Sequence, residues 1–314
     1  MHPILFQIGN FPVGTYGLMI VVGIMAAIGL ASFLARRRGM QPEFFQDLAM
    51  VALLAGFVGG RLLYVLLDVK YYLNNPGEIV FSRGGFVFQG GAILAILVCI
   101  WYIRRHRQPM FETADIAAPA LVLAHAFGRI GCFLAGCCYG LTCTADHAHP
   151  VLEKIAVQYP LVKDAAGNPV EMFNWAYSEQ VRNGLIEPGA AAPLPIVPVQ
   201  LFESAGNFLI CAVLVWAWRR KRFSGQIAAM YLGLYGLLRF SLEFLRGDTE
   251  RGLWLGGSIS TAQIISIGMI AAAAALWAAR MNQGLEPIPA PAQEKPEKKE
   301  AAPAGGKRKH KHSR

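Results

Sequence analysis

Seven long apolar runs alternate with polar segments along this chain of 314 residues. A helix that crosses a bilayer needs about 20 predominantly apolar residues, because hydrocarbon offers no water to hydrogen-bond the backbone. Each run has about that length, and the runs cover residues 16–34, 47–67, 86–103, 114–135, 200–218, 226–245 and 261–279. The pattern predicts an all-α polytopic membrane protein with about seven transmembrane helices.

The composition agrees with a membrane protein. The chain is 54% hydrophobic and only 16% charged, and its mean hydropathy of +0.39 is too high for an ordinary water-soluble domain of this length. No Lys or Arg precedes the first run, whereas an arginine cluster follows it, which is the reverse of a cleavable signal peptide. We therefore expect the first run to remain as a transmembrane helix.

Basic clusters predict the orientation of the chain. They follow the first, third, fifth and seventh runs, at residues 36–38, 104–107, 219–222 and 280. Because Lys and Arg in short loops stay on the cytoplasmic side, the clusters predict an N-out, C-in topology. Residues 1–280 then form one seven-span membrane domain, whose long loop at 141–199 faces the periplasm or the cell exterior as a partly ordered cap.

A basic tail is predicted at residues 281–314. From Asn282 onward the chain is rich in Pro, Ala, Lys and Glu, and its eight Lys or Arg against four Glu give +4 of the total +9. Such a composition predicts a disordered cytoplasmic tail that anionic lipid would attract. Nucleic-acid binding is a rival interpretation of the basic run, but we expect no nucleic-acid partner.

Polar side chains within the runs gather at one predicted depth. A charged side chain in hydrocarbon costs about 2.5–3.5 kcal/mol even on the most lenient scale, so such residues are candidates for function. With the topology above, they occupy the outer halves of the runs, and the inner halves are expected to be almost purely apolar. The candidates are Arg61, Gln89, His125, Arg129, Gln200, Glu203, Tyr235, Arg239, Glu243 and Arg246.

The sixth run carries a polar stripe. Tyr235, Arg239 and Glu243 recur at every fourth residue and Arg246 follows three residues later, so an unbroken helix would place all four on one face. A structural ion pair between Arg239 and Glu243 is the simpler interpretation. However, the intramembrane arginines outnumber the carboxylates at this depth, which favours a bound anion. Guanidinium groups bind phosphate through forked hydrogen bonds, and a phospholipid headgroup is the nearest source.

Six segments, in order along the chain at residues 16–19, 59–64, 84–91, 128–140, 198–203 and 235–246, resemble the prolipoprotein diacylglyceryl transferase family. Two of them are rich in glycine, which permits close backbone approach to a ligand but is also common where membrane helices pack. The resemblance covers nearly all of the chain up to about residue 280.

The resemblance implies an enzyme of the bacterial inner membrane whose active site faces the periplasmic leaflet. It would transfer the diacylglyceryl group of phosphatidylglycerol to the lipobox cysteine thiol in the signal peptide of a prolipoprotein, without metal or cofactor. The residues with an implied catalytic role are Arg129, Arg239 and Tyr235. The residues with an implied role in substrate binding are Tyr16, Arg61, Gln89, Gly90, Gly91, Gly140, Gln200, Glu203, Glu243 and Arg246.

Three residues depart from the family pattern. Gln89, Cys132 and Cys137 stand where the family usually has histidine, asparagine and glutamate. An amide has no useful basicity near pH 7, so Gln89 can hydrogen-bond a substrate but cannot act as a general base. A non-catalytic relative that binds or moves phospholipid is therefore the alternative function, and an outward-facing thiol-disulfide protein is a third.

Four cysteines cluster next to the predicted outer face, at positions 132, 137, 138 and 143. An oxidising compartment would favour a structural disulfide among them, while free packing thiols and a metal or redox site remain alternatives. His125 lies one helical turn before Arg129. It could replace the missing base or serve only in packing and hydrogen bonding.

Overall fold

Seven helices of the computed structural model are long and apolar enough to cross a membrane, which confirms the predicted fold class. The structure describes residues 4–8, 11–81, 85–143, 150–162, 170, 174–246, 252–254 and 258–288. The seven helices are α1 (Thr15–Arg38), α2 (Pro42–Leu67), α5 (Phe88–Arg105), α6 (Met110–Ala135), α9 (Val199–Trp218), α10 (Gln226–Leu242) and α11 (Thr261–Arg280).

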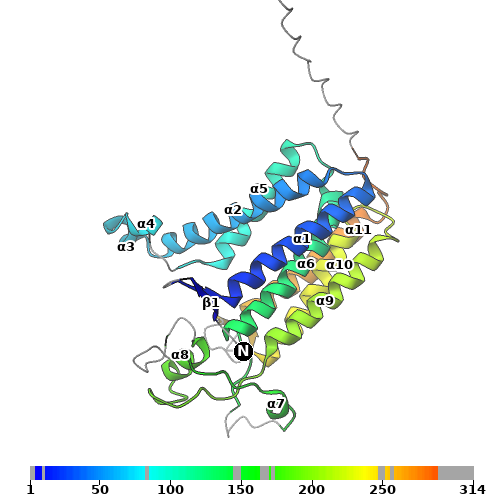
Figure 1. Ribbon diagram of the computed structural model, residues 1–314. Helices are drawn as coiled ribbons and strands as arrows, with labels where there is room; N and C mark the ends of the chain where they lie inside the picture. Colours follow the sequence, from blue (N-terminus) through cyan, green and yellow to red (C-terminus); the bar gives the residue numbers. More distant parts are fainter. Residues whose placement is uncertain are drawn as a thin grey trace, which may run out of the picture.

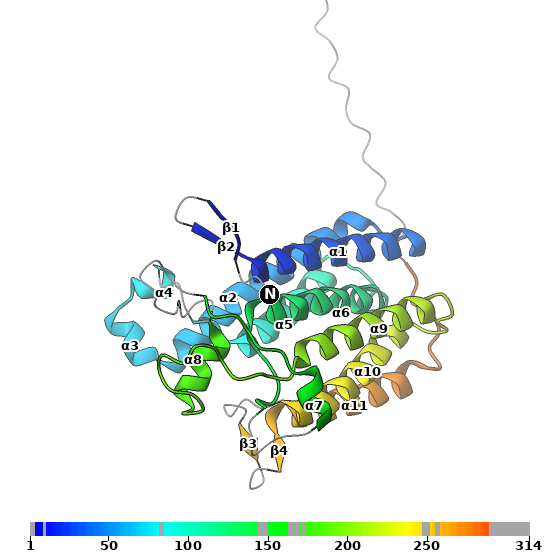
Figure 2. The same cartoon turned by 60° about the horizontal axis from the view of Figure 1, so that its bottom comes forward.

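The shorter elements all lie at one end of the helices, which we name the loop end (Figures 1 and 2). β1 pairs with β2 and β3 with β4, both antiparallel, to form two small hairpins. The shorter elements are β1 (Ile4–Ile8), β2 (Phe11–Gly14), α3 (Val69–Asn74), α4 (Glu78–Phe81), α7 (Pro150–Ile155), α8 (Trp175–Arg182), the 3-10 turn η3 (Glu243–Leu245), β3 (Leu253–Trp254) and β4 (Ile259–Ser260).

The opposite end, which we name the basic end, gathers the four predicted basic clusters. They lie in the last turns of α1, α5 and α11 and directly after α9, so the alternation read from the sequence places them together. The predicted loop at 141–199 contains α7 and α8 at the loop end. Of the predicted tail, residues 289–314 lie outside the described residues.

Helix packing divides the seven transmembrane helices into a bundle of α1, α6, α9, α10 and α11 and a separate pair, α2 and α5, an arrangement that can be followed in Figure 1. α6 packs between α1 and α9, and α10 packs against both α9 and α11. α2 and α5 pack mainly against each other. Buried apolar side chains at the basic end, including Leu34, Phe45, Ile103 and Ile116, join this pair to the bundle. Large apolar side chains such as Phe57 are exposed elsewhere on the pair, as lipid-facing positions would be.

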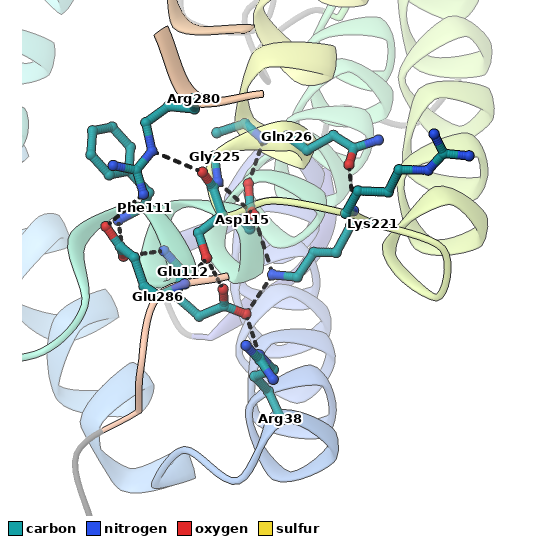
Figure 3. A network of polar contacts seen from close by, with 12 residues as sticks. Arg38, Phe111, Glu112, Asp115, Lys221, Gly225, Gln226, Arg280 and Glu286 are labelled. Carbon is teal, nitrogen blue, oxygen red and sulfur yellow. Dashed lines mark hydrogen bonds and ion pairs between the residues drawn. The ribbon is translucent and has the colours of Figure 1, made fainter. Parts of the chain in front are cut away.

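A buried charged network also ties the helices together at the basic end (Figure 3). Glu112 and Asp115, in the first turns of α6, are fully buried. Lys221, just after α9, forms ion pairs with both carboxylates. Nε of Arg38, at the end of α1, lies 2.6 Å from Oε1 of Glu112. Four charges thus join α1, α6 and the connection between α9 and α10.

Carboxylates in this network also cap helix N-termini. Asp115 accepts hydrogen bonds from the backbone N–H groups of Gly225 and Ala228, each at 2.9 Å, where α10 begins. Glu286, beyond α11, accepts two N–H groups from the first turn of α6, at 3.0 and 3.2 Å. The first N–H groups of a helix lack intrahelical partners and carry partial positive charge, so these contacts stabilise both helix ends.

The expectation of almost purely apolar inner halves is therefore wrong for the fourth run. α6 begins at Met110, four residues before the predicted run, because Pro109 precedes the helix as its N-cap residue. The apolar pattern alone could not reveal that these two carboxylates have cationic partners in distant parts of the chain. Glu112 and Asp115 are stable there because Arg38 and Lys221 neutralise them.

Replacing Lys221 with methionine should destabilise the protein by about 3–5 kcal/mol, because two buried carboxylates would then share too little positive charge. Thermal unfolding in detergent measures the effect. Lys70→Met is the matched control, since Lys70 is exposed on α3. Equal melting temperatures for the two variants would show that the network does not hold the basic end together.

Candidate functional site

An ion pair inside the bundle forms the centre of the site. Nε of Arg129 on α6 lies 3.0 Å from Oε2 of Glu203 on α9, whose side chain is only 1% exposed. A carboxylate with so little solvent requires a partner, and the pair holds α6 and α9 at a fixed distance. His125 completes the contact, because its Nε2 accepts a hydrogen bond from Nε of Arg129 at 3.3 Å and lies 3.5 Å from Oε1 of Glu203.

Tyr235 connects this ion pair to a second one. Its ring centroid lies 5.2 Å from that of His125, and its hydroxyl interacts electrostatically with Arg129 and Arg239. One turn further along α10, Nη1 of Arg239 lies 2.7 Å from Oε2 of Glu243. The structure thus brings together the three residues predicted to be catalytic, while their chemical roles remain predictions.

Each of these two arginines has a carboxylate partner, so the ion-pair interpretation of Arg239 and Glu243 describes the structure correctly. Both arginines nevertheless keep unused donors. A guanidinium group has five N–H donors, and within the described residues the hydrogen bond and ion pair of Arg129 use only Nε and the ion pair of Arg239 uses only Nη1. The remaining donors are suited to a further anion, whose binding stays a prediction.

Arg246 does not continue the polar stripe of α10. The helix ends at Leu242, η3 follows at Glu243–Leu245, and Arg246 has extended backbone with φ −88° and ψ 140°. It forms an isolated antiparallel bridge with Gly140, beyond the end of α6. The prediction of one face for four residues is wrong for Arg246, because the tighter 3-10 turn ends the regular helix before it.

Gly140 lies where the ends of three helices meet. Its backbone N–H donates to the carbonyl oxygen of Val197 at 2.9 Å. A Cβ atom here would lie 2.4 Å from Cγ2 of Val199 and 2.6 Å from the carbonyl oxygen of Leu245. Only glycine permits so close an approach. The structure therefore gives Gly140 a packing role, and its role in substrate binding remains a prediction.

Gln200 fixes the segment that follows α6. It is fully buried, and its Nε2 donates to the carbonyl oxygen of Cys137 at 2.8 Å. Tyr159 holds the last turn of α6 next to this segment, because its hydroxyl donates to the carbonyl oxygen of Phe133 at 2.8 Å. Burial raises the pKa of the Tyr159 phenol, so it remains a neutral donor.

Arg61 and Gln89 lie on the separate pair of helices rather than in the bundle. The Arg61 guanidinium donates to the carbonyl oxygens of Ile79 at 2.9 Å, Gly85 at 3.0 Å and Glu78. It therefore orders the connection between α2 and α5. Gln89 is exposed in the first turn of α5. The contact of Arg61 and Gln89 with substrate remains a prediction.

Gly90 and Gly91 permit close packing of α2 against α5. A Cβ atom on Gly90 would lie 2.5 Å from the carbonyl oxygen of Gly59, and one on Gly91 would lie 2.7 Å from that of Gly56. Small residues at such crossings let membrane helices approach closely. This explains both glycines by packing and leaves their proposed contact with substrate as a prediction.

Tyr16 and a group of thiols border the ion pair. Tyr16, at the start of α1, interacts electrostatically with Arg129 and with the cysteines at 132, 137 and 138. All six cysteines of the chain are free, so the structure favours the interpretations without a disulfide. Hydrogen bonds from Cys132 and Cys137, with Arg129 nearby, lower the pKa of the Cys138 thiol, which lies beyond the end of α6.

Asn207 belongs to the same region and was missed in the sequence. It follows Glu203 by one turn of α9 and is fully buried, and within the described residues neither atom of its amide has a hydrogen-bond partner. Tyr231 was missed as well, although its ring stacks on that of Tyr235 with centroids 5.8 Å apart. The spacing of four residues from a recognised site residue was the available signal in both cases.

Comparisons with known proteins agree with the resemblance read from the sequence. The family model for prolipoprotein diacylglyceryl transferase matches residues 3–279. A relative from Clostridium tetani named phosphatidylglycerol–prolipoprotein diacylglyceryl transferase is 30% identical over 267 residues, covering 85% of this chain and 93% of that protein. A relative of the same name from Clostridium botulinum is 30% identical, covering 85% and 92%. A third relative, from Clostridium perfringens, is named phosphatidylglycerol–prolipoprotein diacylglyceryl transferase 2. It is 30% identical, covering 85% of this chain and 91% of that protein.

The packing role of Gly140 predicts that Gly140→Ala costs about 1–3 kcal/mol of stability, because the added methyl group overlaps Val199. Gly268→Ala is the matched control, since a Cβ atom there would meet nothing within 4 Å. Thermal unfolding of both variants in detergent measures the difference. A Gly140→Ala protein as stable as the control would contradict the close approach of the three helix ends.

Proposed function

Because the chain belongs to the prolipoprotein diacylglyceryl transferase family, we propose that it transfers the diacylglyceryl group of phosphatidylglycerol to the lipobox cysteine thiol of prolipoproteins. The observation that carries this proposal is the cluster of Arg129, Tyr235 and Arg239 between transmembrane helices. Two guanidinium groups in one apolar setting suit the phosphate of an anionic lipid headgroup.

The reaction replaces a carbon–oxygen bond with a carbon–sulfur bond. The glycerol carbon of the diacylglyceryl group loses the oxygen that links it to phosphate, and glycerol phosphate leaves with that electron pair. The cysteine sulfur bonds to the same carbon, and its proton leaves with the products. The site must therefore stabilise negative charge on the departing phosphate and favour thiolate over thiol.

Arg129 and Arg239 are assigned the role of holding the departing phosphate. Glu203 positions Arg129 through its contact with Nε, which leaves both Nη groups directed elsewhere. Glu243 holds Arg239 in the same way, through Nη1. Tyr235 interacts electrostatically with both arginines, and its hydroxyl is assigned the role of orienting the phosphate. Donors fixed before the reaction stabilise developing charge more strongly than donors that must first reorient.

His125 is the nearest candidate for a proton acceptor, since Gln89 is an amide. Its Nε2 already accepts a hydrogen bond from Arg129 and also faces Glu203. The imidazole is therefore already engaged by the cation proposed to bind the phosphate. We assign His125 the role of positioning Arg129, and the two guanidinium groups the role of stabilising thiolate in the acceptor.

The proposed location is the bacterial inner membrane, with the N-terminus outside, the C-terminus inside and the loop end at the periplasmic leaflet. The basic ends of α1, α5, α9 and α11 support this orientation, because short basic segments stay in the cytoplasm. The active site then lies in the leaflet from which secreted prolipoproteins present their signal peptides.

Arg239→Ala should abolish transfer of a labelled diacylglyceryl group from phosphatidylglycerol to a lipobox peptide, and Arg129→Ala should lower its rate by at least about 100-fold. Each variant removes a donor set for the departing phosphate. Arg37→Ala is the matched control, because Arg37 is exposed at the basic end of α1. Mass spectrometry of the thioether product gives the rate.

The same assay on the wild-type protein distinguishes a transferase from a relative that only binds lipid. A folded protein that copurifies with phosphatidylglycerol yet yields no thioether would contradict the transferase and support the non-catalytic alternative. Unchanged rates in Arg129→Ala and Arg239→Ala, with an active wild type, would instead contradict the assigned roles of the arginines.

The proposed orientation predicts different labelling of two introduced cysteines. Glu187→Cys lies at the loop end and Arg220→Cys at the basic end, and both positions are exposed. In right-side-out spheroplasts a membrane-impermeant maleimide should label Glu187→Cys above the wild-type background, whereas Arg220→Cys should label only after lysis. The opposite result would show that the loop end faces the cytoplasm.

A further inference from the structure

Three thiols converge next to the arginine cluster. The Sγ atoms of Cys132, Cys137 and Cys138 all lie within 4.8 Å of one another, and among the described residues they are the one group of three or more side chains placed to hold a metal ion. All three thiols are free. Cys132 lies in the last turn of α6, and the other two lie just beyond the helix.

The backbone after α6 is folded so that adjacent cysteines can face the same point. Gly136 ends the helix in the left-handed region with φ 76°. Cys138 is also left-handed, with φ 57°, a conformation that residues with a side chain rarely adopt. The N–H of Cys137 donates to the carbonyl oxygen of Cys132 at 3.1 Å and closes the turn. An unfavourable conformation held by its surroundings is characteristic of functional sites.

The geometry points to a site for a thiophilic d10 metal ion, which we infer to be Cu(I), bound by Cys132, Cys137 and Cys138. Soft thiolate ligands select Cu(I) and zinc over harder cations. Zinc requires a fourth ligand in a structural site, and the group within the described residues offers three. Three thiolate ligands satisfy Cu(I) without a fourth.

The distances and charges are compatible with this ion. A metal–sulfur bond of about 2.3 Å places three sulfur atoms about 4 Å apart in a trigonal plane, so the thiols need to close by less than about 1 Å. Binding releases three protons and transfers no electron, which gives a complex of charge −2. Arg129 and Arg246 interact electrostatically with Cys138 and can offset that charge. Metal binding does not require transferase turnover, although Arg129 is shared with the proposed phosphate site.

Anaerobic titration of the purified full-length protein with Cu(I), against a chromophoric Cu(I) chelator, tests the site. We expect one Cu(I) per chain, and X-ray absorption should show three sulfur ligands. Replacing all three thiols together, C132S/C137S/C138S, should weaken binding by at least about 100-fold. The chain offers a matched control in its other three cysteines, C99S/C143S/C211S, which should bind as the wild type does.

Several results would overturn the inference. These are a wild type that binds no Cu(I), a C132S/C137S/C138S variant that binds as well as the wild type, or a control variant that loses binding equally. Stoichiometric zinc binding with no Cu(I) binding would also overturn it. Transferase rates measured on the same samples separate this site from the proposed function, because metal binding requires no turnover.

Discussion

The contact between Arg129 and Glu203 is the interaction on which the candidate site depends. Both charges lie on transmembrane helices, where a charge left without a partner costs several kcal/mol. α6 and α9 must therefore stay in contact at this level, and the pair fixes where the remaining guanidinium donors of Arg129 lie. His125 and Tyr235 pack around that arrangement. A site built on helices in this way is more precise than one built on loops.

Polar and charged groups have different roles at the two ends of the helices. At the basic end, Glu112 and Asp115 are matched by cations and by helix N-termini, so the network serves structure (Figure 3). The pair of α2 and α5 is attached to the bundle there. At the loop end, α6 and α10 end before Gly140 and Arg246, whose backbones form an isolated antiparallel bridge.

The apolar pattern predicted seven helices because a bilayer imposes one length and one composition on each span. The spacing of Tyr235 and Arg239 likewise predicted neighbours on one helix face. What the sequence could not give was contact between distant segments. The link from Arg129 to Glu203 joins helices that are far apart in the chain, and the position of Arg246 depends on a 3-10 turn that periodicity does not reveal. Gly90 had two plausible roles, and only the neighbouring helix identified packing.

An experimental structure of the protein with phosphatidylglycerol bound would show whether Arg129 and Arg239 hold the lipid phosphate. We expect the lipid phosphate within hydrogen-bond distance of both Arg129 and Arg239, with Glu203 and Glu243 still holding the opposite sides of the two guanidinium groups. A headgroup bound elsewhere, with both arginines contacting only their carboxylates, would contradict it.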